Sequence, residues 1–466
     1  MDGQPKGKRW RNGGVGVLLL LLGGLLALLL RQPSPQAAER PSLIVLVIDT
    51  VRADRLSSYG HHRLTTPVLD HVAREGVLFE RATSASAWTL PSVSSILSGL
   101  PPSAHGVRAY EDQLPDAVET VAEQLQAAGY HTAFLGVNSL FEAGRNLQQG
   151  FDYYFGIDEI SGEELNQRLQ AWLQERPKDK PTFLYVHYFD PHCRYVPPEP
   201  YRQLYWPPSE AQRTHRTMTP EQWRLMHECF QLHFNPGEPV LDVDYYLSEY
   251  DAELRHVDQV VGLFLERLKT VGLYDQSLLI VTSDHGEEFY DHGGYGHGKV
   301  LNEHTVHVPL MVKLPRGAQA GRRERGRVSS LDLVPTLLSY AGLPIPKRLP
   351  GLNLRPVLEG QATLDPERAV FAETDYEGKQ RAVLQGTFKL LLSPNKSRPT
   401  ALYDLSTDPG EQRDLLKQQP EKMAALTQAL ERFEAAALEV SEDIPGSRQE
   451  LTQETLEQLR ALGYIR

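Results

Sequence analysis

The sequence predicts a doubly wound, mostly parallel α/β sheet, and three features of the chain lead to this prediction. Runs that are apolar at nearly every position, such as 43–48 and 278–282, are typical of strands buried on both faces. Segments with apolar residues at helical spacing, including 67–80 and 250–271, alternate with these runs. Several of the runs end in Asp or His. Ligand groups collect at the carboxyl ends of strands in such sheets, so the pattern favours an enzyme.

The composition is that of a globular protein and excludes some classes of partner. The 466 residues are 41% hydrophobic and 23% charged, as in ordinary globular chains. A formal net charge of −12, with no basic run outside the N-terminal region, argues against nucleic acid as a partner. Cys193 and Cys229 are the only cysteines, which leaves open either one disulfide or two buried thiols.

Residues 1–40 are predicted to be a signal anchor followed by a linker. Basic residues precede an apolar stretch at 13–30, which is near the lower limit for a transmembrane helix. The basic residues lie on the N-terminal side of this stretch. By the positive-inside rule that end stays in the cytoplasm, and the rest of the chain is expected to be exported. We therefore expect a single membrane-spanning helix and an exported catalytic domain, periplasmic or otherwise extracytoplasmic. A cleaved signal peptide is the alternative.

The pattern of the remaining chain predicts three parts. Residues 41–360 carry the alternating strands and helices of a catalytic domain, and 361–440 carry short strands and an amphipathic helix typical of a small α+β subdomain. Residues 441–466 are a polar tail. Within the first part, 195–244 is an insertion rich in Pro, Trp, Tyr and His. It is interpreted either as a lid over the site or as a surface excursion.

The stretch from Trp88 to Gly99 predicts a short helix with a hydroxyl group at its start. Thr89 precedes Pro91, which suits a first helical turn, and Gly99 is a stop signal. Backbone N–H groups at a helix N-terminus favour a bound anion, and a hydroxyl aimed at an anion suits the nucleophile of an ester-transferring enzyme. Taken alone, helix capping is the commoner role of such a threonine.

Two strand ends carry candidate metal ligands. Asp49 follows the first apolar run, and Asp284-His285 follows a later one. An Asp-His pair at a strand end is a compact pair of ligands, whereas an isolated Asp is more often a turn residue. The glycine-rich loop that follows carries His292, His297 and Lys299. Whether His292 and His297 assemble a second metal site is left open.

Seven motifs follow one another along the chain between about residues 41 and 415. They are Ile-Asp-Thr-Val-Arg-Ala-Asp at 48–54, the stretch 89–99 with Ala-His-Gly at 104–106, Gly-Tyr-His-Thr-Ala at 129–133, Phe-Asp-Pro-His at 189–192, Thr-Ser-Asp-His-Gly-Glu at 282–287, His-Gly-Lys at 297–299 and Leu-Tyr-Asp-Leu-Ser-Thr-Asp-Pro-Gly-Glu at 402–411. Considered in this order, they resemble those of the sulfatase branch of the alkaline phosphatase superfamily. The resemblance implies that superfamily's fold, with a small antiparallel C-terminal subdomain.

The resemblance also implies roles for particular residues. By motif, the metal ligands are Asp49, Thr89, Asp284 and His285, and Thr89 is also the nucleophile. His192, His297 and Lys299 match positions that contact the anionic group or the leaving oxygen, in both catalysis and substrate binding. Lys299 would supply a fixed positive charge, and either histidine could protonate the departing alcohol.

The sequence departs from the family pattern at several of these positions. Sulfatases oxidise a Cys, or sometimes a Ser, within Cys-x-Pro-x-Arg to formylglycine, but here the two key positions are Thr89 and Val93. No formylglycine is therefore expected. The family's Gly-Lys-x-His is Gly-Val-Asn-Ser at 136–139, its Asp-Asp pair is Asp49-Thr50, and its Asp-Asn pair is Asp284-His285.

These departures affect both the expected metal and the expected reaction. An imidazole in place of an amide, with one carboxylate fewer, favours Mn²⁺ or Zn²⁺ over Ca²⁺. The prediction is a metal-dependent hydrolase of a sulfate, phosphate or phosphonate ester, with Thr89 as nucleophile. Its substrate would be an anionic ester of a glycan, a lipid or a small molecule. A phosphoglycerol- or phosphoethanolamine-type transferase of the cell envelope is one alternative, and a non-catalytic binding protein on the same fold is a more distant one.

Overall fold

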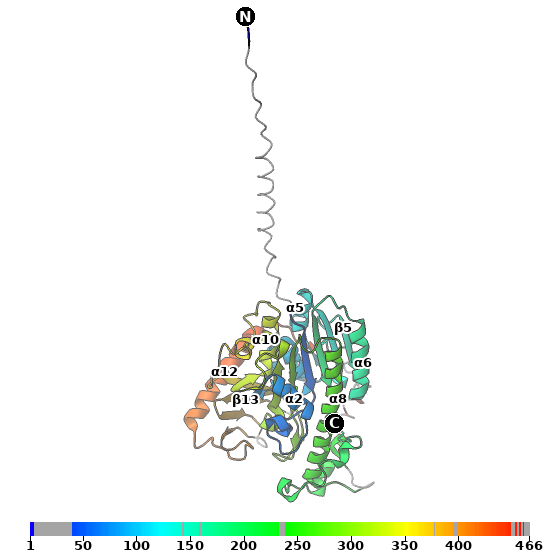
Figure 1. Ribbon diagram of the computed structural model, residues 1–466. Helices are drawn as coiled ribbons and strands as arrows, with labels where there is room; N and C mark the ends of the chain where they lie inside the picture. The colour runs from blue at the N-terminus through cyan, green and yellow to red at the C-terminus, as the bar shows by residue number, and fades with distance from the viewer. Residues whose placement is uncertain are drawn as a thin grey trace. The chain divides into compact units, whose positions relative to one another are not determined.

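A computed structural model of the chain describes residues 1–3, 40–141, 144–157, 160–232, 238–376, 378–395 and 399–448, together with residues 453, 456, 457 and 460. The chain divides into two units, Met1–Arg40 and Pro41–Arg466, and the second unit contains the folded elements (Figure 1). The predicted C-terminal tail lies mostly outside the described residues.

The predicted α/β fold is confirmed: the second unit is built on a mixed, mostly parallel sheet. Among the described residues this sheet has eight strands in the order β11-β2-β10-β7-β1-β6-β4-β5. Only β10 runs antiparallel to its neighbours β2 and β7. The strands are β1 (Leu43–Ile48), β2 (Val77–Thr83), β4 (His131–Val137), β5 (Tyr153–Ile157), β6 (Thr182–Tyr188), β7 (Leu278–Thr282), β10 (His307–Lys313) and β11 (Arg322–Ser329).

Helices cover both faces of this sheet, as a doubly wound fold requires. Three pack on one face: α3 (Thr89–Ser98), α5 (Val121–Ala127) and α10 (Leu333–Tyr340). Three pack on the other: α2 (Pro67–Glu75), α6 (Gly162–Glu175) and α8 (Val243–Thr270). The shorter helices of the unit are α4 (Pro102–His105), α7 (Pro220–Leu225), α9 (Glu303–Val306) and α11 (Arg355–Leu358).

Strand β1 lies near the centre of the sheet because all six of its residues are apolar. Successive side chains of a strand point to opposite faces, so Leu43, Val45 and Val47 join the core on one face. Ile44, Leu46 and Ile48 join the core on the other. The strand pairs in parallel with β6 and β7, and so its carboxyl end lies beside theirs.

A separate antiparallel sheet follows in the C-terminal part of the chain. Its strands are β12 (Ala369–Thr374), β13 (Gln380–Gln385), β14 (Phe388–Leu392) and β15 (Ala401–Asp404), paired in that order. Helix α12 (Pro420–Ser441) packs against this sheet through Leu426 and Leu430 (Figure 1). Two further two-stranded ladders occur, β3 (Asp112–Gln113) with β16 (Ser447–Arg448) and β8 (Glu288–Phe289) with β9 (Tyr295–Gly296).

The membrane prediction requires correction. Among the described residues, no helix is both long enough and apolar enough to cross a bilayer. The apolar stretch at 13–30, on which the predicted signal anchor and membrane-anchored localisation depended, lies outside the described residues. A transmembrane helix, a membrane partner and an exported, membrane-anchored domain are therefore not retained as properties of this protein.

Candidate active site

The carboxyl ends of β1 and β7 bring three of the predicted metal ligands together. Val47 of β1 is in register with Thr282 of β7, so the residues that follow the two strands are neighbours. Asp49, Asp284 and His285 each present one ligand atom, and these three atoms lie within 4.8 Å of one another. All three side chains are fully buried.

The electrostatics of this cluster fit a divalent cation. Within the described residues, Oδ1 of Asp49 and Oδ2 of Asp284 are buried and have no hydrogen-bond partner. Burial raises the pKa of Asp284, and the neighbouring charge of Asp49 raises it further. Two carboxylates sharing a dry site repel each other, and buried oxygens without donors are costly. A bound cation would satisfy both oxygens and relieve the repulsion.

Two side chains that the sequence did not predict as site residues hold Asp49 in place. Asn138, at the end of β4, donates a hydrogen bond from Nδ2 to Asp49 Oδ2 at 3.0 Å. Nε2 of His187, on β6, lies 3.4 Å from the same oxygen and 4.0 Å from Asp284 Oδ2. Both side chains are fully buried. Partners of this kind orient the ligands of a metal and increase its affinity.

Thr89 is the first residue of α3, directly after the N-cap residue Trp88. Its Oγ1 lies 3.1 Å from Nε2 of His285. Nδ1 of His285 lies 2.9 Å from the carbonyl oxygen of Gly286, which can only accept, so Nδ1 donates and Nε2 faces Thr89. The structure thus places the Thr89 hydroxyl beside the candidate metal cluster, at the positive end of a helix.

Further along α3, a serine fixes the helix against the metal-binding segment. The Ser92 hydroxyl donates to the carbonyl oxygen of Asp284 at 2.6 Å, and that of Ser84 donates to the same oxygen. Every residue of α3 is buried. The distance between Thr89 and the ends of β1 and β7 is therefore set by packing and by hydrogen bonds rather than by a mobile loop.

The two predicted catalytic histidines lie next to each other beside this cluster. The ring centroid of His297 is 4.4 Å from that of His285 and 5.1 Å from that of His192. Burial lowers the pKa of His192 to about 4, and burial together with the charge of His285 lowers the pKa of His297. His192 donates from Nδ1 to the carbonyl oxygen of Cys193 at 3.0 Å.

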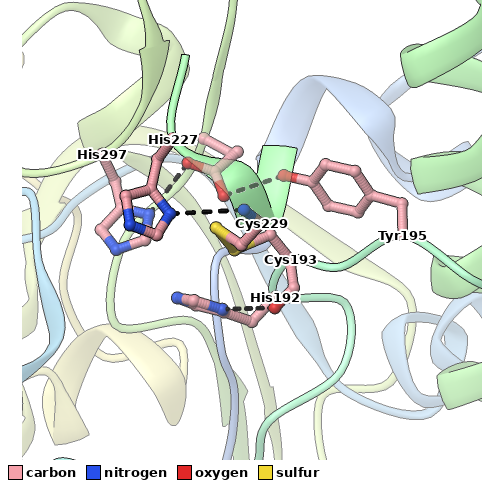
Figure 2. Close-up of a disulfide and its surroundings, with 7 residues drawn as sticks. His192, Cys193, Tyr195, His227, Cys229 and His297 are labelled. Carbon is pink, nitrogen blue, oxygen red and sulfur yellow. Dashed lines mark hydrogen bonds and ion pairs between the residues drawn. A yellow bond between two sulfur atoms is a disulfide. The ribbon is translucent and has the colours of Figure 1, made fainter. Parts of the chain in front are cut away.

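Glu287 orients His297 and is a third residue that the sequence did not assign to the site. Its Oε1 lies 2.9 Å from Nδ1 of His297, and its Oε2 accepts a hydrogen bond from the Tyr195 hydroxyl at 3.0 Å (Figure 2). Burial raises the pKa of Glu287 to about 7. The carboxyl group links the histidine to the start of the 195–244 insertion.

A cavity of about 230 Å³ opens next to His297 and Lys299. Lys299, predicted to contact the anionic group, thus lies in the same cavity wall as His297. Aromatic and apolar side chains supply most of the remaining wall. These include Tyr110, Met226, Phe230, Tyr290, Tyr295 and Tyr376. Met226 and Phe230 belong to the insertion at 195–244, which therefore borders the site.

A disulfide joins the insertion to the loop that carries His192. Cys193 and Cys229 are bonded to each other (Figure 2). The sequence left open a disulfide or two buried thiols, and the structure has the disulfide. Cys193 directly follows His192, and Cys229 directly precedes the cavity residue Phe230. The backbone N–H of Cys229 also donates to Nδ1 of His227, another residue of the cavity wall.

The loop that carries His297 and Lys299 is held by the segment before α3 and by the small C-terminal sheet. The backbone N–H of Gly298 donates to the carbonyl oxygen of Ala87 at 2.7 Å, two residues before Thr89. The Thr374 hydroxyl, at the end of β12, donates to the carbonyl oxygen of Gly298 at 2.6 Å. The small C-terminal sheet therefore helps to position a candidate catalytic loop.

His292 does not join His297. It lies with His304 and Glu411 in a second group whose ligand atoms are within 4.8 Å of one another. Among the described residues, no group of metal-type side chains contains both His292 and His297. Nδ1 of His297 lies 2.9 Å from Oε1 of Glu287.

Comparisons with known proteins identify the family of the chain. The sulfatase family profile matches residues 41–343, and a second profile, that of the N-sulphoglucosamine sulphohydrolase C-terminal region, matches residues 291–437. An N-acetylglucosamine-6-O-sulfatase of Bacteroides thetaiotaomicron is 23% identical, with 89% of this chain and 91% of the relative covered. The human N-sulphoglucosamine sulphohydrolase is 27% identical, with 72% of this chain and 69% of the relative covered.

Solved structures show the same fold. A protein solved in complex with its substrate D-glucosamine-2-N,6-O-disulfate superposes with a TM-score of 0.73 at 21% identity, covering 87% of this chain and 99% of that one. The phosphonate monoester hydrolase of Agrobacterium radiobacter gives a TM-score of 0.72 at 22% identity, covering 89% and 99%. Because the sulfatase profile spans most of the chain, this protein belongs to the sulfatase family of metal-dependent ester hydrolases.

Proposed function

We propose that this sulfatase-family hydrolase cleaves a sulfate, phosphate or phosphonate monoester with Thr89 as its nucleophile. One observation carries the proposal: Oγ1 of Thr89 lies 3.1 Å from Nε2 of His285. His285 belongs to the cluster that also contains Asp49 and Asp284. A hydroxyl at the start of a buried helix, beside a metal-type cluster, is placed to attack an anionic ester group.

Asp49, Thr89, Asp284 and His285 would hold one divalent ion. Two carboxylates, one imidazole and one hydroxyl form a set of oxygen and nitrogen donors that suits Mn²⁺ or Zn²⁺ better than Ca²⁺, which takes more ligands and only oxygens. When bound, such an ion favours deprotonation of the hydroxyl and neutralises charge on the ester oxygens. Asn138 and His187 would keep Asp49 in its ligating orientation.

In the first half of the reaction, Oγ1 of Thr89 attacks the sulfur or phosphorus atom while the bond to the alcohol oxygen breaks. The products are an ester of Thr89 and the free alcohol. The proton lost from the threonine reaches the alcohol through His192 or His297, whose rings lie edge to face beside the cluster. Lys299 supplies positive charge to the anionic group from the cavity wall.

In the second half, water attacks the threonine ester, releases sulfate, phosphate or phosphonate, and restores the hydroxyl. This route differs from that of a formylglycine enzyme, in which the hydrated aldehyde expels sulfate by reforming its carbonyl group. Threonine cannot form that aldehyde, and no cysteine occupies the position. The same histidines that protonate the alcohol would then take a proton from the attacking water.

The cavity gives some information about the alcohol half of the substrate. Aromatic side chains line it, among them Tyr110, Phe230 and Tyr376, and Lys299 supplies a positive charge. Such a wall suits a sugar or aryl ring that carries an anionic ester. The relatives named above act on sulfated sugars or phosphonate esters, which supports the same substrate class. Neither the transferase nor the binding-protein alternative gains support from an observation, and both are set aside.

The test pairs an aryl sulfate with an aryl phosphonate monoester and assays both with added Mn²⁺ or Zn²⁺. Thr89→Ala should lower kcat by at least about 10³-fold for whichever ester the wild type cleaves, because nucleophile and metal ligand are lost together. Thr132→Ala is the matched control: it also removes a buried threonine hydroxyl, which donates to the carbonyl oxygen of Gly150. Undiminished cleavage by Thr89→Ala would overturn the proposed role.

A further inference from the structure

A second group of metal-type side chains lies outside the candidate active site. His292 comes from the loop between β8 and β9, His304 from α9, and Glu411 from the segment after β15. One ligand atom from each lies within 4.8 Å of the other two. The three segments are separated in sequence, so the tertiary fold is what brings these donors together.

His304 is the most informative member of this group. It is only 6% exposed, yet within the described residues its Nε2 has no hydrogen-bond partner. The neighbouring carboxylate oxygen Oε2 of Glu288 lies 3.8 Å away, beyond hydrogen-bonding distance. A buried ring nitrogen without a hydrogen bond is costly, and it lies within a group of other donors, as a metal ligand does.

Glu411 is held in a ligating position by its surroundings. It is 2% exposed, its Oε1 lies 2.9 Å from Lys389 Nζ, and its Oε2 accepts the backbone N–H of Glu303 at 2.8 Å. Lys389 is shared, because its ammonium group also pairs with Oε1 of Glu303 at 2.8 Å. Glu288 and Glu303 bring two further carboxylates to this group, and Arg327 and His307 also lie near Glu303.

His292 gives the group access to solvent. Its side chain is 22% exposed and its Nε2 lies 3.8 Å from Oε2 of Glu411. The rings of His292 and His304 are stacked with centroids 5.3 Å apart. All three residues border a cavity of about 840 Å³ that is separate from the one beside Lys299. An ion could therefore enter from this cavity without passing through the candidate active site.

We propose that His292, His304 and Glu411 form a second divalent-metal site, with Zn²⁺ as the preferred ion. Two imidazoles and one carboxylate are a donor set that zinc binds well and that calcium, which prefers oxygen, binds poorly. Zinc bonds of about 2.0–2.2 Å place donors roughly 3–4 Å apart, so the group closes by about 1 Å on binding. The partly exposed His292 ring is the member that can make most of this movement.

The ion would connect parts of the chain that serve the candidate active site. The loop of His292 continues through β9 directly to His297 and Lys299. Glu411 belongs to the C-terminal sheet region, which also holds Gly298 through Thr374. Zinc would therefore tie the catalytic loop to the small sheet at a second point, as a structural ion.

The test is metal stoichiometry on the full chain, stripped with a chelator and then titrated with Zn²⁺. The wild type should bind two ions per chain, and His292→Ala should bind one. An Asp49→Asn/Asp284→Asn variant should also bind one ion, and adding His292→Ala to that variant should abolish its binding. His71→Ala is the matched control, because it removes a half-exposed histidine that pairs with Glu75 at 3.3 Å. It should retain both ions.

A second readout separates ligation from folding. Zn²⁺ should raise the Tm of the Asp49→Asn/Asp284→Asn variant, since an ion that binds only the folded chain stabilises it, and His292→Ala should abolish that rise. Because His292 is partly exposed, its loss is not expected to unfold the chain. An Asp49→Asn/Asp284→Asn variant that binds no ion, or one whose ion survives His292→Ala, would overturn the proposal whether or not Thr89 proves to be the nucleophile.

Discussion

Asn138 Nδ2 donates a hydrogen bond to Oδ2 of Asp49 across a distance of 3.0 Å. In the sequence alone, the segment 136–139 shows only that two residues of the family's Gly-Lys-x-His are replaced. The structure shows that the asparagine in this segment supports a candidate metal ligand instead. The bond joins the end of β4 to the end of β1, two strands that are separated in the sheet by β6.

The first prediction concerns this bond. Asn138→Ala should weaken binding of the divalent ion at the Asp49 cluster by about 10- to 100-fold, because partners that orient a ligand commonly contribute that much affinity. Competition against a chelator of known affinity measures the change. Asn353→Ala, which removes a hydrogen bond to Ser339 Oγ outside the cluster, should leave the affinity unchanged. Equal affinities in Asn138→Ala and wild type would show that the bond does not support the ligand.

A second prediction concerns the orientation of His297 by Glu287. Glu287→Ala removes the 2.9 Å contact with Nδ1 of His297, and kcat should fall by about 10- to 100-fold, the equivalent of a lost hydrogen bond to a charged group. KM should change little, because Glu287 is not part of the cavity wall. Steady-state kinetics with the cleaved aryl ester separates the two parameters.

The Tyr195 hydroxyl allows a graded comparison. Tyr195→Phe removes only its bond to the far oxygen of Glu287, so kcat should fall by no more than about tenfold. Tyr205→Phe removes a tyrosine hydroxyl bonded to the carbonyl oxygen of Leu64 and should have no effect. A larger loss in Tyr195→Phe than in Glu287→Ala would contradict this order of effects.

A third prediction concerns acid stability. His105 is fully buried: its Nδ1 accepts from the N–H of Val107 and its Nε2 lies 3.1 Å from Ser95 Oγ, so the ring is neutral. Burial, with the nearby charge of Arg108, lowers its pKa to about 3. The unfolded chain therefore binds a proton that the folded chain does not at any pH between about 3 and 6.5, and stability falls as the pH falls through this window.

The size of the effect follows from the same pKa difference. When the pH is lowered from 7 to 4.5, His105 should decrease the unfolding free energy of the wild type by about 2–3 kcal/mol. The decrease in unfolding free energy of His105→Gln over the same interval should be smaller than that of the wild type by this amount. Urea unfolding at the two pH values measures it. The half-exposed His71 supplies the control, because His71→Gln should follow the wild type. Parallel losses in His105→Gln and wild type would exclude His105 as a source of acid sensitivity.

A fourth prediction concerns the disulfide. The Cys193–Cys229 bond joins residues with a sequence separation of 36. Replacing both cysteines with Ser should lower stability by about 3–4 kcal/mol, because the unfolded chain gains the freedom of that loop. The insertion also carries Met226 and Phe230 of the cavity wall, so KM should rise. Reduced wild type should behave as the double variant, and Tm and KM measurements on both will show whether it does.

Strands β1 and β7 could be predicted closely from the sequence because each is almost entirely apolar and is followed by a candidate site residue. The helix expected at 67–80 was wrong from residue 76 onward: α2 ends at Glu75 and β2 begins at Val77. A Cβ at Gly76 would lie 2.5 Å from the carbonyl oxygen of Val312 in β10. This close approach of another strand ends the helix, and it depends on a distant part of the chain that local periodicity cannot reveal.

The seven predicted site residues were found from strand ends and family motifs, and the structure brings them to one region. Their roles remain predictions. Asn138 and His187 could not be assigned in the same way, because their contacts with Asp49 depend on how the strands pair. Glu287 lies within the 282–287 motif, but its partners His297 and Tyr195 come from other segments. His187 lies opposite Gly136 of β4, where a Cβ would come within 3.1 Å of the His187 Cβ, so the glycine makes room for the histidine. For His187, the signal in the sequence was a polar residue in a mostly apolar strand.

The most direct test of the central claim is to look for the covalent ester on Thr89. The enzyme is mixed with the cleaved aryl ester, quenched in acid during turnover, digested, and analysed by mass spectrometry for a sulfate or phosphoryl group on the peptide that contains residue 89. We expect the group on Thr89, lost in Thr89→Ala and retained on the substituted serine in Thr89→Ser. Turnover by the wild type with no modified Thr89 peptide, or with the group on another residue, would contradict the account.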